Sequence, residues 1–103
     1  MKLTVPLRLL ISKRAAAQIQ RRAVWWEENR PAAPGAVAAD FGEAVKLLLE
    51  QPGIGAKYDG SRTQGVRRLY LNRLEYFIYY KADKTELRVL AFWGASRGKQ
   101  PRT

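Results

Sequence analysis

The sequence contains neither cysteine nor histidine among its 103 residues. Without cysteine the protein has no disulfide framework and no thiolate zinc site. Without histidine it lacks the side chain that most often transfers protons near neutral pH. Carboxylates are the remaining metal ligands, and they are scattered along the chain rather than clustered. We therefore expect no metal and no cofactor, and any catalysis must use Arg, Lys, Tyr or carboxylate groups.

Long apolar runs and an apolar leader are also missing from the sequence. No stretch of 18 consecutive apolar residues is present, so the sequence predicts a cytoplasmic protein with no membrane span. The length suits one compact domain, residues 1–103. Because 47% of the residues are apolar and three of them are Trp, the chain is expected to bury a core of its own.

Acidic residues are few compared with basic ones. The chain has 9 Asp and Glu against 19 Lys and Arg, which gives a net charge of +10. From Lys57 onward it has 11 basic and 4 acidic residues, so the excess lies mainly in the second half. A positive field favours nucleic acid or an acidic protein as the partner. No membrane partner is expected, because the first predicted helix offers only a weak amphipathic wedge. The alternative is a basic surface that only keeps a small protein soluble.

The first third of the chain predicts a strand followed by a helix. Residues 3–11 alternate loosely between apolar and polar types, and Pro6 suits an edge strand, where a missing N–H is tolerated. Ser12 is placed to cap the helix that follows, which is expected to run to about Asn29.

A second helix follows a break at residues 30–35, which contain two prolines and a glycine. Its apolar spacing predicts a helix over roughly 35–51. The two helices are expected to form an antiparallel hairpin packed by Trp26 and Phe41. The glycine-rich residues 53–65 are expected to be a loop that can lie along a ligand.

The last part of the chain predicts three strands in an antiparallel meander, joined by short turns at 72–73 and 83–84. The strands are expected at residues 66–71, 75–80 and 87–93. The middle strand is apolar on both faces and should be central. The resulting fold class is α+β (β-α-α-β-β-β), with an N-terminal edge strand and the helices on one sheet face. Residues from about 95 to 103 are expected to be a mobile basic tail.

Arginines and tyrosines are interleaved in these strands. A guanidinium group can bind phosphate or carboxylate, and an aromatic ring can stack on a base. Arg67, Arg73 and Arg97 are expected at strand ends, along the rim of the face that the helices leave open. Which of Arg67 and Arg68 faces outward depends on a one-residue register. Strand tyrosines also have an ordinary explanation, because aromatic side chains fit a pleated surface. Trp25 is expected to pack in the core.

The same residues can be compared with the groups that RNA cleavage requires. Attack by the 2′-hydroxyl needs a proton acceptor, a proton donor and stabilisation of charge on phosphorus. Arginines can supply the last of these. Tyr or Lys would have to supply the other two, although their ordinary pKa values lie near 10. For a ribonuclease, the candidate catalytic residues are Lys57, Arg67, Arg73, Tyr80 and Arg97.

Several segments, in this order, resemble the RelE/ParE toxin family of type II toxin–antitoxin systems, over about Leu9 to Arg97. The segments are Trp-Glu-Glu-Asn-Arg-Pro-Ala-Ala (26–33), Gln-Pro-Gly-Ile-Gly (51–55), Gly-Val-Arg-Arg-Leu (65–69), Tyr-Phe-Ile-Tyr-Tyr (76–80) and Val-Leu-Ala-Phe-Trp-Gly-Ala-Ser-Arg (89–97). The resemblance implies a small α+β toxin encoded beside an antitoxin, whose acidic, partly disordered segment wraps the toxin. Any oligomeric state is then expected to arise through the antitoxin.

The resemblance also implies which residues bind the target or the antitoxin. The basic and aromatic positions of the family fall on Arg67, Arg68, Arg73, Tyr76, Tyr80 and Arg97. One branch of the family cleaves messenger RNA on the ribosome, often with a His shortly before the last arginine. The other branch poisons DNA gyrase and is associated with plasmid stabilisation. Here the segment before Arg97 is Gly-Ala-Ser, without His.

These features favour a ParE-like toxin that inhibits DNA gyrase without being an enzyme, because the joint at residues 29–33 is similar to the gyrase-directed branch. One alternative is a RelE-like, ribosome-dependent mRNA endonuclease (an mRNA interferase) that works with Arg, Lys and Tyr. The other is a non-toxic nucleic-acid-binding module.

Overall fold

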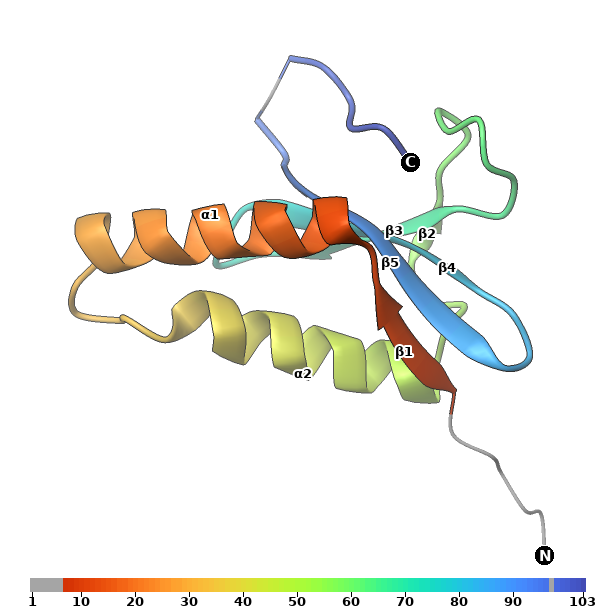
Figure 1. Ribbon diagram of the computed structural model, residues 1–103, viewed down its shortest axis with the longest axis horizontal. Helices are drawn as coiled ribbons and strands as arrows, with labels where there is room; N and C mark the ends of the chain where they lie inside the picture. Colours follow the sequence, from red (N-terminus) through yellow and green to blue (C-terminus); the bar gives the residue numbers. More distant parts are fainter. Residues whose placement is uncertain (1–6, 97) are drawn as a thin grey trace, which may run out of the picture.

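The computed structural model describes residues 7–96 and 98–103 (Figure 1). In chain order, its elements are β1 (Arg8–Ile11), α1 (Lys13–Asn29), α2 (Ala36–Glu50), β2 (Ala56–Lys57), β3 (Arg67–Leu71), β4 (Tyr76–Ala82) and β5 (Glu86–Gly94). The described part of the expected strand 3–11 contains β1, and residues 3–6 of that expectation lie outside the described residues. Pro6, for which an edge position was predicted, lies outside the described residues.

All five strands belong to one sheet with the order β1-β5-β4-β3-β2. The strands β3, β4 and β5 form the predicted antiparallel meander, with β4 in the middle. The strand β1 lies at an edge, as predicted, and pairs in parallel with β5, so the sheet is mixed. Sequence periodicity gave no indication of this pairing, because it brings together strands from opposite ends of the chain.

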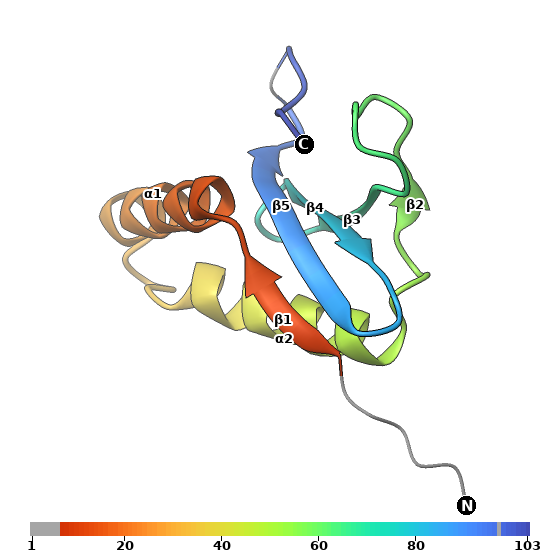
Figure 2. The ribbon, with the colours of Figure 1, turned by 45° about the vertical axis from the view of Figure 1, so that its right-hand side comes forward.

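Both helices lie side by side on one side of the sheet (Figures 1 and 2), which confirms the predicted α+β arrangement. Their apolar faces and one sheet face form the main core, in which Leu48, Ile78 and Leu87 are fully buried. Trp26 is buried in this core and Phe41 packs against it, as predicted for the helical hairpin. The opposite sheet face has no helix over it and is called the open face below.

Ser12 joins β1, α1 and β5 at one point. Its hydroxyl accepts a hydrogen bond from the backbone N–H of Ala15 and donates one to the carbonyl of Leu90 (3.0 and 3.2 Å). The register between β4 and β5 shifts between Tyr79 and Tyr80, which leaves Leu90 as an extra residue in β5. A bulge of this kind bends a strand locally. Here it supplies a carbonyl to the residue that caps α1.

The connection between β3 and β4 is longer than the predicted turn at 72–73, since it covers residues 72–75. Leu74 within it is fully buried in the main core. Glu75 has a positive φ of 55°, an uncommon conformation for a residue with a side chain. Its carbonyl accepts a hydrogen bond from Ala95 N–H (2.9 Å), which holds the turn against the end of β5.

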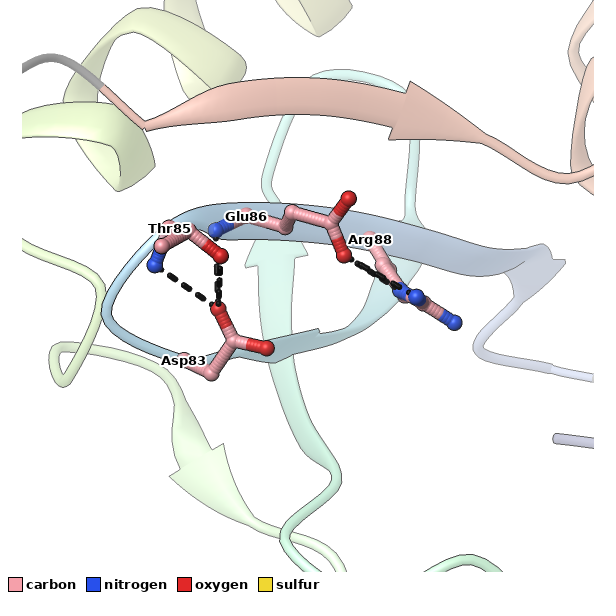
Figure 3. Close-up of polar contacts among 4 residues, drawn as sticks. All are labelled: Asp83, Thr85, Glu86 and Arg88. Atoms are coloured by element: carbon pink, nitrogen blue, oxygen red, sulfur yellow. Dashed lines mark hydrogen bonds and ion pairs between the residues drawn. The ribbon is translucent and has the colours of Figure 1, made fainter.

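The turn between β4 and β5 is built around Asp83 (Figure 3). Its Oδ1 accepts hydrogen bonds from the backbone N–H groups of Thr85 and Glu86, each at 2.8 Å, and from the Thr85 hydroxyl at 3.1 Å. These bonds hold the pKa of the Asp83 carboxyl below its ordinary value. Next to the turn, Glu86 and Arg88 form an exposed ion pair (2.9 Å).

The glycine-rich segment 53–65 is not entirely a loop. Ala56 and Lys57 form the short strand β2, which pairs with Arg68 and Arg67 of β3. The strand β2 covers only the beginning of the β3 edge.

Candidate functional site

The register of β3 decides which of the two neighbouring arginines faces outward. Arg67 lies opposite Tyr80 on the helix-covered face, whereas Arg68 lies opposite Tyr79 on the open face. Arg67 is therefore directed to the side that holds the main core, and Arg68 to the side without helices.

On the helix-covered side, Arg67 and Tyr80 hold the loop that follows α2. The Tyr80 hydroxyl donates a hydrogen bond to the carbonyl of Pro52 (2.7 Å) and accepts one from the N–H of Gly55 (2.9 Å). The Arg67 guanidinium donates to the carbonyl of Gly55 (2.7 Å). A Cβ atom at Gly55 would lie 2.5 Å from the Tyr80 hydroxyl, so this close approach requires glycine.

Tyr80 is consequently a poor candidate for proton transfer. Its side chain is fully buried, and its hydroxyl is already both a donor and an acceptor. Burial raises the pKa of Tyr80, against smaller opposing effects of the Gly55 hydrogen bond and of Arg67. A phenol in this setting stays protonated and bound to the loop.

On the open face, Arg68 covers a cluster of aromatic rings. Its guanidinium carbon lies 4.3 Å from the centre of the Phe77 ring and 5.3 Å from that of Tyr58. It also donates a hydrogen bond to the Tyr79 hydroxyl (3.3 Å). The Tyr58 and Tyr79 rings meet edge to face at 5.0 Å. We call Arg68, Tyr58, Tyr70, Phe77 and Tyr79 the arginine–aromatic patch.

Burial raises the pKa of the Tyr58 phenol, and Tyr79 adds to this shift while Arg68 opposes it. The Tyr58 hydroxyl is buried and has no hydrogen-bond partner among the described residues. A phenol with a raised pKa is a weaker acid than usual and is not ionised near neutral pH. Tyr58 therefore offers no ready proton acceptor to the patch.

The C-terminal residues 98–103 contact the open face. The Tyr79 hydroxyl donates to the side-chain oxygen of Gln100 (3.0 Å), and the Trp93 indole N–H donates to the carbonyl of Lys99 (2.8 Å). Pro101 is buried, and Thr63 donates to the carbonyl of Thr103 (3.0 Å). In Figures 1 and 2 this segment and the loop before β3 lie at the same end of the sheet. The mobility of the tail stays a prediction.

The other predicted site residues do not join this patch. Arg73 lies beyond the far end of β3 and forms a bidentate pair with Asp40 of α2 (2.9 and 2.6 Å). Lys57 is exposed on β2, and Arg97 lies outside the described residues. The expectation that Arg67, Arg73 and Arg97 share one rim is wrong for Arg67 and Arg73. Arg67 is at the first residue of β3, and Arg73 comes after its last.

Tyr76 lies beside Arg22 and Trp25 of α1, which were not among the predicted site residues. Arg22 of α1 lies over the rings of Trp25 (4.1 Å) and Tyr76 (4.6 Å). Trp25, for which core packing was expected, is 38% exposed. The spacing of Gln18, Arg22 and Trp25 places them on one helix face, which was the available signal.

Within the part of the chain that the structure describes, no group of three or more Asp and Glu residues is arranged to hold a metal ion. None of the described helices is long and apolar enough to span a membrane.

Comparisons with known proteins bear on the family and the fold. Residues 9–98 match the family described as the ParE toxin of the type II toxin–antitoxin system, parDE. Among solved structures, the chain is similar to one described as the chromosomal ParDE toxin–antitoxin system from P. aeruginosa. That likeness has 22% identity and a TM-score of 0.67, and covers 87% of this chain and 97% of the other.

A second similar structure is that of the YoeB dimer from Staphylococcus aureus. The identity is 17% and the TM-score 0.60, with 86% of this chain and 97% of the other covered. At these identities both likenesses concern the fold. No curated protein matches the sequence.

Proposed function

Since the chain belongs to the ParE toxin family of type II toxin–antitoxin systems, we propose that it inhibits growth by binding DNA gyrase and is neutralised by a cognate antitoxin. In this proposal the toxin acts in the cytoplasm, through protein contacts and without bond cleavage. The arginine–aromatic patch forms part of the contact surface. The similarity of residues 29–33 to the gyrase-directed branch supports the choice of target.

The observation that carries the proposal is the chemistry of the open face. Arg68 lies over apolar rings and donates only to a tyrosine hydroxyl among the described residues. Arginine and aromatic residues are enriched at the centres of protein interfaces, where they supply both area and directional hydrogen bonds. Such a patch suits recognition of another macromolecule.

Tyr58 and Tyr80 do not supply the proton transfers that RNA cleavage needs. The chain has no histidine, and the Tyr80 hydroxyl is occupied by Pro52 and Gly55. Tyr58 and Tyr80 both have raised pKa values, so neither is poised to accept a proton near neutral pH. This is why a binding mechanism is favoured over a catalytic one.

One observation favours the alternative of a ribosome-dependent mRNA endonuclease. Arg68 and Tyr79 are in hydrogen-bond contact on the open face. An arginine beside a phenol resembles, in chemistry, the charge stabiliser and proton donor that phosphodiester cleavage requires. Such an enzyme would depend on the ribosome to orient the RNA, because orientation alone lowers a barrier substantially.

Regulated expression in a bacterial host separates these functions in one culture. A gyrase-directed toxin should induce the DNA damage response while transcripts remain intact, and purified protein should inhibit supercoiling by gyrase. Cleaved transcripts without DNA damage would contradict the proposal and support the endonuclease.

Normal growth, together with strongly salt-dependent binding to naked nucleic acid, would instead indicate a non-toxic nucleic-acid-binding module. Co-expression of the acidic protein encoded beside the gene should restore growth if it is the antitoxin. An Arg68→Gln variant should fail to inhibit gyrase. This result would show that inhibition depends on the arginine–aromatic patch.

A further inference from the structure

A cleft between α1 and the ends of β4 and β5 lies apart from the arginine–aromatic patch. It has a volume of about 520 Å³. We call it the Arg22 cleft, and its walls are formed by Gln18, Arg21, Arg22, Trp25, Tyr76, Phe92 and Trp93. The residues that line the cleft include two arginines and no Asp or Glu, so the lining is positively charged.

Arg22 is held in the cleft by aromatic rings. Its guanidinium carbon lies 4.1 Å from the centre of the Trp25 ring and 4.6 Å from that of Tyr76. Stacking of this kind fixes the plane of the guanidinium and leaves its N–H groups at the edge of the plane. The ring of Tyr76 is in turn packed against Phe92 (4.7 Å), so the side chain is preorganised.

The charge of Arg22 is poorly compensated. Among the described residues, its one hydrogen bond goes from Nη2 to the carbonyl of Leu74, at a long 3.4 Å. Its Nε is buried with no partner. The two ion pairs in the described part of the chain involve Arg73 and Arg88 instead. An arginine that is half-buried without a carboxylate is costly, unless a partner supplies one.

We infer that the Arg22 cleft binds a side-chain carboxylate from the acidic segment of the antitoxin, an inference that rests on the proposed function. A carboxylate can accept two parallel hydrogen bonds from one guanidinium fork, which is among the strongest polar contacts in proteins. The positive charge of the chain complements an acidic segment. Neutralisation would thus include a defined anchor on α1.

The walls of the cleft favour a peptide over duplex DNA as the source of the anion. Trp25, which is 38% exposed, and Trp93 contribute apolar surface to the cleft. An extended peptide can place an apolar neighbour on this surface while its carboxylate meets Arg22. In duplex DNA the bases are paired and stacked within the helix, so a phosphate bound to Arg22 would bring no base to these rings.

A titration of the intact, 15N-labelled protein tests the chemistry directly. The Nε–Hε signal of Arg22, assigned by its loss in Arg22→Lys, is followed during addition of a capped Leu-Glu-Leu peptide. We expect this signal to shift with Leu-Glu-Leu and not with Leu-Gln-Leu. An equal shift with inorganic phosphate or with duplex DNA would overturn the assignment to a peptide carboxylate. So would the absence of any shift with Leu-Glu-Leu.

A second measurement uses the purified acidic protein encoded beside the gene. By calorimetry, Arg22→Gln should weaken its binding roughly 10- to 100-fold, as expected for loss of a hydrogen-bonded charge pair. The matched control is Lys13→Gln, which removes one charge from the exposed first turn of the same helix. Equal weakening in both variants would show that binding depends only on the net charge of the protein, and this would overturn the inference.

Folding and function are controlled separately. Thermal unfolding identifies a variant that has lost its structure, and Arg22→Lys then serves as the second variant because it keeps the charge without the planar fork. Neither binding measurement involves gyrase. If gyrase inhibition fails while the carboxylate binds, the proposed target is wrong and the cleft stands. If gyrase inhibition succeeds while no carboxylate binds, the assignment of the cleft is wrong and the proposed target stands.

Discussion

The two faces of the sheet differ in what their side chains do. On the helix-covered face, the aliphatic residues Ile78, Leu87 and Val89 are fully buried, and the polar group of Tyr80 is bonded to a loop. On the open face, rings lie beneath Arg68 and are contacted by the C-terminal segment rather than by helices. One face therefore stabilises the fold, while the other leaves charge and aromatic surface for a partner.

The comparison teaches that residue type is a poor guide to role in this fold. Tyr79 and Tyr80 are adjacent and almost completely buried, at 1% and 0% exposure. Because successive residues point to opposite faces, one contacts Arg68 and the other holds the loop after α2. Four substitutions, ordered by their expected effect on stability, examine this division.

Leu48→Ala should have the largest effect, since it opens a cavity in the main core. The free energy of unfolding should fall by about 2–5 kcal/mol, the range for large-to-small changes at fully buried sites. Urea denaturation measures this. The adjacent Leu47→Ala is the control, because Leu47 is 40% exposed. Similar losses in the two variants would mean that α2 does not pack as described.

Tyr80→Phe removes a hydroxyl and leaves the Pro52 carbonyl and the Gly55 N–H unpaired. The expected loss is about 1–3 kcal/mol, the cost of buried polar groups without partners. Tyr70→Phe should change stability little, because Tyr70 is 43% exposed. Toxicity of the folded Tyr80→Phe variant should persist. A stable but non-toxic Tyr80→Phe variant would assign the phenol a direct functional role.

Arg68→Gln should leave the free energy of unfolding within about 1 kcal/mol of the wild type, since a cation–π contact at a partly exposed site contributes about that much. Its effect on growth inhibition should nevertheless be large, because the patch loses its charge. Growth after induction and thermal unfolding are measured together. Arg88→Gln, which removes an exposed open-face arginine already paired with Glu86, is the control. Unfolding of Arg68→Gln would show that the arginine is structural.

The smallest effect is expected from Asp83→Asn, in the turn that joins β4 to β5. The pKa of Asp83 is lowered in the folded state by its hydrogen bonds. Its carboxylate therefore stabilises the fold above the ordinary pKa of about 4, and this is lost as the pH falls through the lower folded value.

A series of Tm values from neutral to acidic pH measures the effect of Asp83→Asn. The variant should be less stable than the wild type at neutral pH, and the difference should shrink in acid. The control is Asp59→Asn, which removes the charge of an exposed loop carboxylate. A constant difference at all pH values would contradict the role of the charged form.

Local patterns were sufficient for much of the fold. The spacing of apolar residues predicted both helices, and the two-sided apolar character of β4 predicted its central position. The patterns did not predict the pairing of β1 with β5 or the burial of Leu74 in a turn. Both depend on residues distant in the chain, and periodicity carries no information about which distant partner is chosen.

The candidate site was less predictable for a related reason. The family resemblance named Arg68 and Tyr76 among the candidate contact residues, and this stays a prediction, because the surroundings of each candidate depend on a tertiary neighbour. Arg73 pairs with Asp40, which lies 33 positions earlier, and Tyr80 bonds to a loop 25 positions earlier. Arg22 escaped notice because a basic residue on a helix usually faces solvent. Its proximity to Trp25 follows from helix spacing, but its position over Tyr76 appears only after α1 is packed on the sheet.

The contact between Ser12 and β5 bears on how this chain matures during synthesis. The start of α1 and the strand β1 are completed by Val89 and Leu90 of β5, and Leu90 comes 78 residues after Ser12. Bringing such distant residues together delays folding, because the intervening chain must first be closed into a loop. The first strand and the start of α1 therefore cannot be completed until β5 has been synthesised.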